Sequence, residues 1–412
     1  MGSYWNDDSR WRYLTGWVLA LGLFVLISGK VWLTSGSARN SQVYFFLLLP
    51  ALIYLVAVVA TRRARLPGVC YWVWASYLVW VALSGLWSSG SEVDALALAK
   101  RGLFIALFMV AVHMLVDSSP QVFRRVLSGA VIVVALGALA TLYFQFYWLD
   151  RSFHYRAFRL DRLGIGEFAN YRYPVAAGMF HGAIASWAFA LAVDRTASLR
   201  KAVVWMLVFM VLAAYVLLTY ARGAWIALAA SCLLAILLQR SRLGWWLFSV
   251  GLAVGLVAAL IWKDHLLNEL LTRRLSGRSP IWEYFFSSMS GSWIAGHGLG
   301  TPFAYHWPDG KTVSPHAHSL YLQQVYDSGL VAVGLLLAGL GCVMKKAWKM
   351  RHDPLVCLAL PALCYALIVM LTDVERIYTR PGDYWTIVWL PLAVLLAVTQ
   401  RGRGLERCAK NN

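Results

Sequence analysis

Long apolar stretches alternate with short polar stretches along almost the whole chain. A window of about 20 mostly apolar residues is long enough to cross a hydrocarbon core of about 30 Å as a helix. The pattern predicts an all-α polytopic membrane protein of about 12 transmembrane helices, with residues 1–412 forming a single transmembrane domain. The predicted spans are approximately 13–34, 43–60, 68–87, 102–116, 126–148, 174–193, 202–220, 224–239, 244–262, 319–342, 354–372 and 384–399.

Two longer polar segments interrupt this alternation. Short loops on one side of the predicted bundle are rich in Lys and Arg, such as TRRAR (61–65) and KKAWKMR (345–351), and such loops face the cytoplasm. Both termini fall on that side. We therefore predict that 149–173 is a periplasmic amphipathic segment, that 263–318 is a large periplasmic loop, and that both termini are cytoplasmic.

The composition adds limits on function. The 412 residues are 60% hydrophobic and carry a formal net charge of +18. Lys and Arg on the outer side exceed what topology requires, which indicates an anionic partner there or contact with phospholipid headgroups. No GxxxxGK[ST] or strand-borne GxGxxG motif is present, so no nucleotide-binding domain is predicted. The six cysteines lie in predicted spans or the C-terminal tail, which predicts no disulfide framework in the outer loops.

The first outer segment is rich in arginine. RSFHYRAFRLDRLGIGEFANYRYP (151–174) contains five arginines and no lysine, a bias that favours flat, bidentate recognition of oxyanions. Arg156, Arg159 and Arg162 recur every three residues opposite an apolar stripe. This spacing predicts an interfacial amphipathic helix. Its role is open between lying on the bilayer and binding a lipid phosphate or a substrate.

Another arginine lies in a very short connection between two spans. The turn TYARGAW places Arg222 at the outer membrane boundary beside Gly223. Glycine at this position lets a ligand or another backbone come close. The alternative for Arg222 is an anchor whose long side chain reaches the membrane interface.

A further candidate arginine lies in the second outer segment. Arg278 precedes Ser279 and Pro280, which are typical of an N-cap and a first helical position. A guanidinium beside free backbone N–H groups favours phosphate binding. The alternatives are an ion pair with Glu283 or capping of a neighbouring helix.

The rest of this segment contains an amphipathic run and two turns. The run is DHLLNELLTRRL (264–275). Glycines in GHGLG (296–300) and the Pro-Asp-Gly of WPDGK (307–311) indicate tight turns.

Two histidines stand just before a long apolar run, in SPHAHSLYLQQVYDSG (314–329). On a helix, residues two apart point about 200° away from each other, so His316 and His318 are not expected to bind one metal ion. If the helix starts near His318, its positive dipole end disfavours imidazolium. A neutral imidazole is the base that proton abstraction requires at neutral pH. A purely structural interfacial histidine is the alternative.

Two residues further along this span are also candidates. Gly329 lies on the same helical face as His318, about 16 Å deeper, and makes room for an acyl or polyprenyl chain or for a neighbouring helix. Asp327 faces nearly the opposite way at a predicted mid-membrane position, so it needs a partner. A functional role and packing against a polar group of another helix are both open for Asp327.

The histidine region resembles the bacterial O-antigen ligases, within the superfamily that they share with O-antigen polymerases and protein O-oligosaccharyltransferases. The family's H-[NSQ]-x9-G element is matched by His318, Ser319, nine residues and Gly329. The likeness covers roughly 200–340 by motif and the whole chain by the number of spans and the large outer loop.

The arginine elements are also similar to those of this family. Arg222 and Gly223 are similar to its arginine-glycine element at a span end. Arg278 and Trp282, followed by the glycines of 296–300, are similar to its R-x3-W element leading to G-x-G. Their order and location agree with the family pattern.

The resemblance implies a fold like that of the C-class glycosyltransferases, in the bacterial inner membrane, with a periplasmic active site and no metal or other cofactor. The implied donor is O-antigen polysaccharide on undecaprenyl diphosphate, and the implied acceptor is a hydroxyl of the outer core sugar of lipid A–core. His318 would be the catalytic base in an inverting transfer, and Arg222 and Arg278 would bind the diphosphate. Membrane phospholipids surround such a protein, and no nucleic-acid partner is implied.

Several alternatives stay open. An O-antigen polymerase shares these motifs, whereas a protein O-oligosaccharyltransferase usually has an additional soluble C-terminal region. A transporter or flippase would place charged residues near mid-membrane in paired broken helices, for which Asp327 and GLAVG (251–255) are the hints. The acidic pairs in SEVDA (91–95) and DVE (373–375) favour a divalent ion as an alternative to metal-free chemistry.

Overall fold

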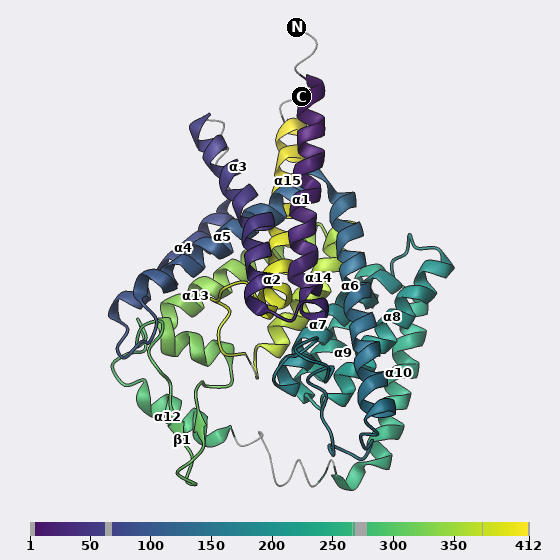
Figure 1. Cartoon of the computed structure of the whole chain (residues 1–412). Helices are drawn as coiled ribbons and strands as arrows, with labels where there is room; N and C mark the ends of the chain where they lie inside the picture. Colours follow the sequence, from purple (N-terminus) through teal and green to yellow (C-terminus); the bar gives the residue numbers. More distant parts are fainter. Residues whose placement is uncertain (1–4, 62–67, 266, 268–277, 373, 411–412) are drawn as a thin grey trace.

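The computed structural model describes residues 5–61, 68–265, 267, 278–372 and 374–410, and these are mostly helical (Figure 1). β1 (Tyr305–His306) and β2 (Val313–Ser314) form a short antiparallel hairpin. In chain order the helices are α1 (Trp5–Trp32), α2 (Gly36–Val43), α3 (Leu49–Ala60), α4 (Val69–Ser84), α5 (Ala95–Ser118), α6 (Pro120–Leu142), α7 (Pro174–Ala192), α8 (Leu199–Leu218), α9 (Arg222–Gln239), α10 (Arg242–Ile261), α12 (Ser279–Ser288), α13 (Leu320–Lys349), α14 (Pro354–Val369) and α15 (Leu390–Lys410).

Short non-α turns extend several of these helices. π-helical turns at Tyr44–Leu48, Tyr143–Trp148 and Trp385–Trp389 continue α2 into α3, extend α6 and precede α15. A 3-10 turn at Gly85–Trp87 follows α4. The resulting segments Gly36–Ala60 and Pro120–Trp148 are therefore long enough to cross a bilayer.

The multi-pass architecture predicted from the apolar windows is confirmed. Nine helical segments among the described residues are long and apolar enough to span a membrane. Three shorter apolar helices accompany them, at Arg242–Val257, Pro354–Val369 and Trp385–Gln400. These segments coincide with the windows of the sequence, whereas the number of helices that actually cross the bilayer stays a prediction.

The two ends of the bundle differ in structure. The N-terminal end of α1 and the C-terminal end of α15 lie together at one end, whereas α12 and the β1–β2 hairpin lie at the other (Figure 1). We call the end with α12 the outer end. Its assignment to the periplasm stays a prediction that rests on the basic loops.

A helix rich in Ala and Gly, α7, lies near the middle of the molecule in Figure 1. Small residues let neighbouring helices approach closely in a membrane, and α8, α9 and α14 all pack on α7. A Cβ on Gly182 would lie 2.2 Å from Oη of Tyr365 in α14. This glycine is therefore required for the contact between α7 and α14.

α9 and α14 run in opposite directions beside α7. Near the end of α9, Gln239 Nε2 donates to the carbonyl oxygen of Ala190, close to the C-terminal end of α7 (3.2 Å). Near the start of α14, Cys357 lies close to Asp194, just beyond the same end of α7. The start of α9 and the end of α14 consequently meet at the outer end of the molecule.

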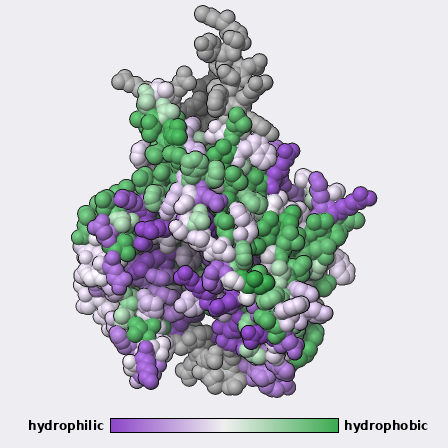
Figure 2. Space-filling model, in the orientation of Figure 1, coloured by the Kyte–Doolittle hydropathy of each residue, from purple (hydrophilic) through white to green (hydrophobic). Residues whose placement is uncertain are grey.

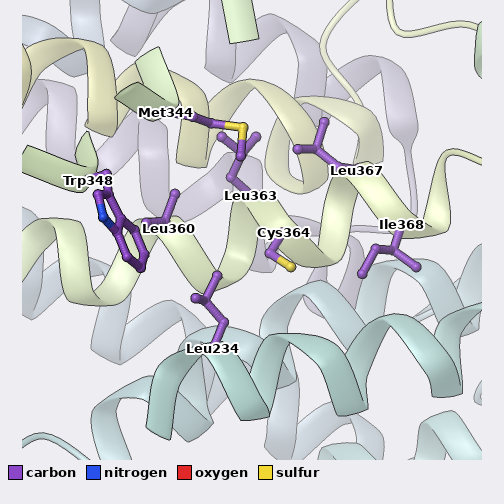
Figure 3. Close-up of a pocket in the computed structure, with 8 residues that line it drawn as sticks. All are labelled: Leu234, Met344, Trp348, Leu360, Leu363, Cys364, Leu367 and Ile368. Carbon is purple, nitrogen blue, oxygen red and sulfur yellow. The ribbon is translucent and has the colours of Figure 1, made fainter. Parts of the chain in front are cut away.

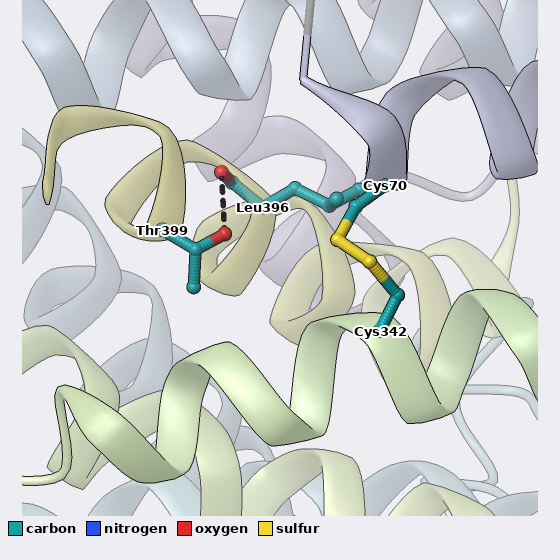
Figure 4. The surroundings of a disulfide bond; sticks show 4 residues. All are labelled: Cys70, Cys342, Leu396 and Thr399. Carbon is teal, nitrogen blue, oxygen red and sulfur yellow. Dashed lines mark hydrogen bonds between the residues drawn. A yellow bond between two sulfur atoms is a disulfide. The ribbon is translucent and has the colours of Figure 1, made fainter. Parts of the chain in front are cut away.

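A disulfide bond joins two spans far apart in sequence. Cys70 of α4 bonds to Cys342 of α13, 272 residues later (Figure 4). The sequence predicted no disulfide in the outer loops, and this bond lies between helices. It holds α4 beside the half of α13 that is remote from the histidines.

The predicted helix around Arg156, Arg159 and Arg162 is wrong. Residues 151–173 contain turns and bends but no helix, and φ is positive at Arg156 and at Arg172. The segment is instead tied to the turn between α8 and α9, because Arg159 Nε donates to the carbonyl oxygen of Thr219 (2.8 Å). These arginines therefore belong to a folded loop that packs on the bundle.

The second outer segment has its own small core. α12, the hairpin and the start of α13 enclose apolar side chains that include Phe285, Phe303 and Tyr326. The predicted Pro-Asp-Gly turn is confirmed, because Asp309 Oδ1 accepts hydrogen bonds from the backbone of Lys311 and Thr312 within the hairpin. Most of the amphipathic run 264–275 lies outside the described residues.

The surface of the outer half is strongly polar. Figure 2 shows hydrophilic residues gathered around a hollow in the middle of this face, whereas apolar residues cover much of the flanks. The hollow lies below α2 and between α13 and α7 in this view. The candidate site is built from segments that converge on this region.

Candidate active site

The histidine segment stands directly before a helix and is held in an irregular conformation. α13 begins at Leu320, with Ser319 as its N-cap in an extended conformation. His318 has φ of +50°, which non-glycine residues rarely adopt and which marks a constrained position. The predicted start of a helix near His318 is therefore correct to within two residues.

Both backbone groups of the residue between the histidines are bonded to side chains. The N–H of Ala317 donates to Oε1 of Gln323 in α13 (2.9 Å). Its carbonyl oxygen accepts from Nε1 of Trp282 in α12 (3.0 Å). Trp282, which the sequence singled out only as part of a motif, thus ties the histidine segment to α12, as Gln323 ties it to α13.

The two imidazole rings lie against each other. Their centroids are 4.1 Å apart, and the backbone N–H of His318 donates to Nδ1 of His316 (3.2 Å). The expectation that the rings point apart is wrong, because it assumed that both residues are helical. Both rings are half-buried, and among the described residues no hydrogen bond to a ring nitrogen of His318 is seen.

The environment keeps both histidines neutral. Burial lowers the pKa of His318 to about 4, with further contributions from His316 and Arg278. Burial likewise lowers the pKa of His316 to about 4, helped by the charges of Arg376 and Arg278. A neutral imidazole was predicted from the helix dipole, whereas burial and nearby guanidinium groups produce it here.

Arg278 stands where α12 begins. It is the N-cap residue of this helix, one position earlier than the predicted cap at Ser279. A shift of one residue is ordinary at helix ends, and the prediction that Arg278 lies beside a helix N-terminus is confirmed. Because its charge acts on both imidazoles, Arg278 lies close to the histidine pair.

Arg222 begins α9 at the same outer end. Ser231 Oγ in α9 donates to the carbonyl oxygen of Pro361 in α14 (2.9 Å), and the two helices are antiparallel. Arg222 lies nine residues before Ser231 in α9, and Met370 lies nine residues after Pro361, just beyond α14. Because the two helices are antiparallel, Arg222 lies level with Met370. The carbonyl oxygen of Met370 accepts from the N–H of Leu320 (3.0 Å). α9 and α13 therefore both begin beside the end of α14.

Asp327 has the partner that its buried position requires. Arg376, from the loop after α14, binds it in a bidentate manner, with Nε–Oδ2 of 2.6 Å and Nη2–Oδ1 of 3.0 Å. Gln323 Nε2 also donates to Oδ1 (3.0 Å). Since Gln323 holds Ala317, a continuous chain of hydrogen bonds runs from Arg376 to the backbone between the histidines.

The role predicted for Gly329 is corrected by the structure. α13 is interrupted at this residue, which has φ of +74°. The space in front of it is filled by the backbone of the loop after α12, since a Cβ on Gly329 would lie 1.9 Å from the carbonyl oxygen of Ile294. This backbone leaves no room at Gly329 for a lipid chain or another helix.

The glycine-rich turn GHGLG supplies backbone hydrogen bonds to α13 where that helix is interrupted. The N–H groups of His297 and Gly298 donate to the carbonyl oxygens of Tyr326 (2.7 Å) and Asp327 (3.0 Å). Gly296, Gly298 and Gly300 all have positive φ, as a tight turn of this kind requires. The histidine motif and the glycine-rich turn are thus two parts of one structure.

Gly329→Ala is expected to destabilise the protein by about 3 kcal/mol or more. Alanine at positive φ is strained, and its Cβ would displace the Ile294 carbonyl. Thermal unfolding of the purified protein in detergent measures this change. Gly334→Ala, on the same helix with no atom within 4 Å of the added Cβ, is the matched control and should be neutral or slightly stabilising. Equal stability of the two variants would contradict the prediction.

Three arginines form a second group that sequence reasoning missed. Arg376 and Arg380 come from the loop after α14, and both interact electrostatically with Arg101 of α5. The unpaired acid predicted at Asp327 signalled a missing cation, but the sequence did not indicate which one. Among the described residues, no group of three His, Cys, Asp or Glu side chains is arranged to hold a metal ion.

The fold and this site define the class of protein: a multi-pass membrane protein with half-buried neutral histidines and clustered arginines at one end of its helical bundle. Residues 205–337 match the model of the Wzy_C family, described as O-antigen ligase. Arg222, Arg278, His318 and Gly329 all lie inside this match.

A curated relative extends the similarity to nearly the whole chain. The chain is 25% identical over 401 residues to an O-antigen ligase of Pseudomonas aeruginosa, and the alignment covers 95% of this chain and 93% of the relative. The resemblance to the O-antigen ligases is therefore confirmed.

Proposed function

We propose that this protein transfers O-antigen polysaccharide from undecaprenyl diphosphate to the outer core sugar of lipid A–core. The transfer takes place at the periplasmic face of the bacterial inner membrane, with both termini in the cytoplasm. It inverts the configuration of the transferred sugar and requires no metal ion. Similarity to the O-antigen ligases supports the general reaction, and the geometry of the histidine site supports its details.

The observation that carries the proposal is the state of His318. Its ring is half-buried, its pKa is lowered by burial and by the charge of Arg278, and the backbone of the preceding residue is held by Gln323 and Trp282. A neutral imidazole accepts the proton of the acceptor hydroxyl as that oxygen attacks the anomeric carbon. The bond between this carbon and the diphosphate oxygen then breaks, and undecaprenyl diphosphate leaves with the bonding electrons.

The arginines have a distinct task in this mechanism. Negative charge grows on the diphosphate as the glycosidic bond breaks, and fixed cations stabilise it. Arg278 and Arg222 supply guanidinium groups that bind phosphate oxygens in a bidentate manner. They take the part that a divalent ion plays in other enzymes.

An apolar groove supports the use of a lipid-linked donor. Leu234 of α9, Met344 and Trp348 of α13 and five residues of α14 line a groove of 450 Å³, with no charged residue among them (Figure 3). Near one end, the carbonyl oxygen of Leu367 accepts a hydrogen bond from Tyr321 Oη (3.2 Å). Tyr321 follows His318 by three residues, so this hydrogen bond links one end of the groove to the start of α13, which the histidines precede.

Purified protein is expected to form ligated lipopolysaccharide from undecaprenyl-diphosphate glycan and lipid A–core in the presence of EDTA. Product is measured by gel mobility and mass spectrometry. Activity that EDTA removes and a divalent ion restores would contradict metal independence. A second assay, in which an undecaprenyl-linked glycan replaces lipid A–core, tests whether lipid A–core is the acceptor.

The other outcomes of this assay assign the protein to a different function. Product formed only with two undecaprenyl-linked glycans would identify an O-antigen polymerase. Movement of the donor across a proteoliposome membrane without bond formation would identify a transporter. Ligation to lipid A–core alone supports the proposal.

A further inference from the structure

A second pair of arginines lies next to the histidine site. Arg101 of α5 and Arg380 of the loop after α14 interact electrostatically with each other. The phenol of Tyr44 lies near both guanidinium groups. Arg376 also acts on Arg101, so three positive charges meet at the outer ends of α5 and α14.

The loop that carries Arg380 is held firmly against α5. Oη of Tyr378 packs on Gly102, where a Cβ would lie 2.0 Å from it. On the other side of the loop, Trp385 Nε1 donates to the carbonyl oxygen of Thr379 (3.1 Å). Arg380 is therefore placed opposite Arg101 by a packed structure, although its own side chain is exposed.

The charge balance of this group is incomplete. Arg376 pairs with Asp327 and Glu375, and Glu375 also acts on Arg101, so two carboxylates face three guanidinium groups. Over the described part of the chain, no ion pair or hydrogen bond to either Arg101 or Arg380 is seen, and Nε of Arg101 is buried without a partner. Adjacent like charges and an unsatisfied buried N–H both raise the free energy. A bound oxyanion would relieve both costs.

The position of this pair separates it from the proposed donor site. Arg278 acts on both histidines, whereas Arg376 is the principal charge on His316. Arg101 interacts with both Arg376 and Arg380, so the pair groups with Arg376. A transfer between two anionic glycolipids needs cations for each of them, and Arg101 and Arg380 supply a group besides the proposed donor arginines.

We propose that Arg101 and Arg380 bind a phosphate monoester of the acceptor glycolipid. This inference rests on the proposed function, in which the acceptor is the phosphorylated lipid A–core. Two guanidinium groups match the geometry of a phosphate better than two ammonium groups would. Binding at this pair orients the acceptor so that its core sugar reaches His318.

The test measures the KM of each substrate for the full chain in neutral detergent. Arg380→Gln and Arg101→Gln are expected to raise the KM for phosphorylated lipid A–core about tenfold, with kcat and the KM for the donor nearly unchanged. Arg195→Gln, an exposed arginine beyond the other end of α7, is the matched control. With the wild-type protein, acceptor that has been treated with alkaline phosphatase should show a KM that is raised by the same factor. Arg380→Gln should not raise the KM for this dephosphorylated acceptor any further.

Equal effects of Arg380→Gln on phosphorylated and dephosphorylated acceptor would overturn the inference, as would a raised KM for the donor. Competitive inhibition by added phosphatidylglycerol that disappears in Arg380→Gln would assign the pair to phospholipid headgroups instead. Direct binding of lipid A–core without donor gives an independent readout. Absence of ligation by the wild-type protein would refute the proposed function. Binding of lipid A–core that depends on its phosphates and is lost in Arg380→Gln would still support the acceptor site.

Discussion

His318→Ala is expected to lower the rate of ligation by at least about 100-fold, because general base catalysis typically contributes a factor of about 10² to 10⁴. The ring of His318 makes no hydrogen bond within the described residues, so its removal leaves few contacts of the fold unsatisfied. Expression, thermal unfolding and binding of the donor should therefore stay close to wild type. The measurement is the initial rate of ligation at saturating donor and acceptor.

Two further histidine variants separate catalysis from structure. His316→Ala removes the acceptor of the His318 N–H and should lower the rate less than His318→Ala does. His306→Ala changes an exposed residue of the hairpin and should have no effect. Unchanged ligation by His318→Ala, or a greater loss in His316→Ala, would refute the assignment of His318 as base.

The pH profile provides a second measurement of the same assignment. With a pKa of about 4, His318 is the neutral base throughout the range from about pH 5 to pH 8. An unshifted histidine, with a pKa of about 6.5, would be only about 3% neutral at pH 5. The value of kcat should therefore stay nearly constant down to about pH 5 and fall as the pH approaches 4. A fall centred near pH 6.5 would show that the ring is not buried as described.

The apolar windows predicted the helices well because the thickness of a bilayer fixes their length. The arginine-rich segment 151–173 shows where such reasoning fails. Its three-residue spacing is typical of a helix, yet Arg156 and Arg172 have positive φ and Arg159 binds the turn between α8 and α9. These contacts are made with distant parts of the chain, and a local pattern cannot reveal them.

The candidate site was predicted in part. His318, Arg278 and the need of Asp327 for a partner could be read from the sequence. Arg376 could not, because it is 49 residues from Asp327. For Gly329 the sequence indicated a close approach but not its partner, which is the backbone of Ile294 and Ala295, just before the glycine-rich turn. Motif spacing therefore indicated the segments of the candidate site, whose roles stay predictions, while the contacts between these segments required the structure.

Arg376→Gln is expected to destabilise the protein by about 3–5 kcal/mol, because loss of one partner leaves the carboxylate of Asp327 buried and unpaired. The side chain of Asp327 is 2% exposed, so water cannot replace the guanidinium. Thermal or denaturant unfolding in detergent measures this effect. Arg124→Gln is the matched control, since it breaks a more exposed ion pair with Asp194 near the opposite end of α7, and it should cost about 1 kcal/mol or less.

A double variant tests whether this pair acts on the histidines as well as on stability. Replacing a buried ion pair by apolar residues is often neutral or stabilising, so Asp327→Leu combined with Arg376→Met should be more stable than either single variant. Its kcat should nevertheless stay well below wild type, because Gln323 loses the carboxylate that orients it toward Ala317. Recovery of both stability and kcat would show that the pair only stabilises the fold. Recovery of stability alone identifies Asp327 and Arg376 as positioning residues for His318.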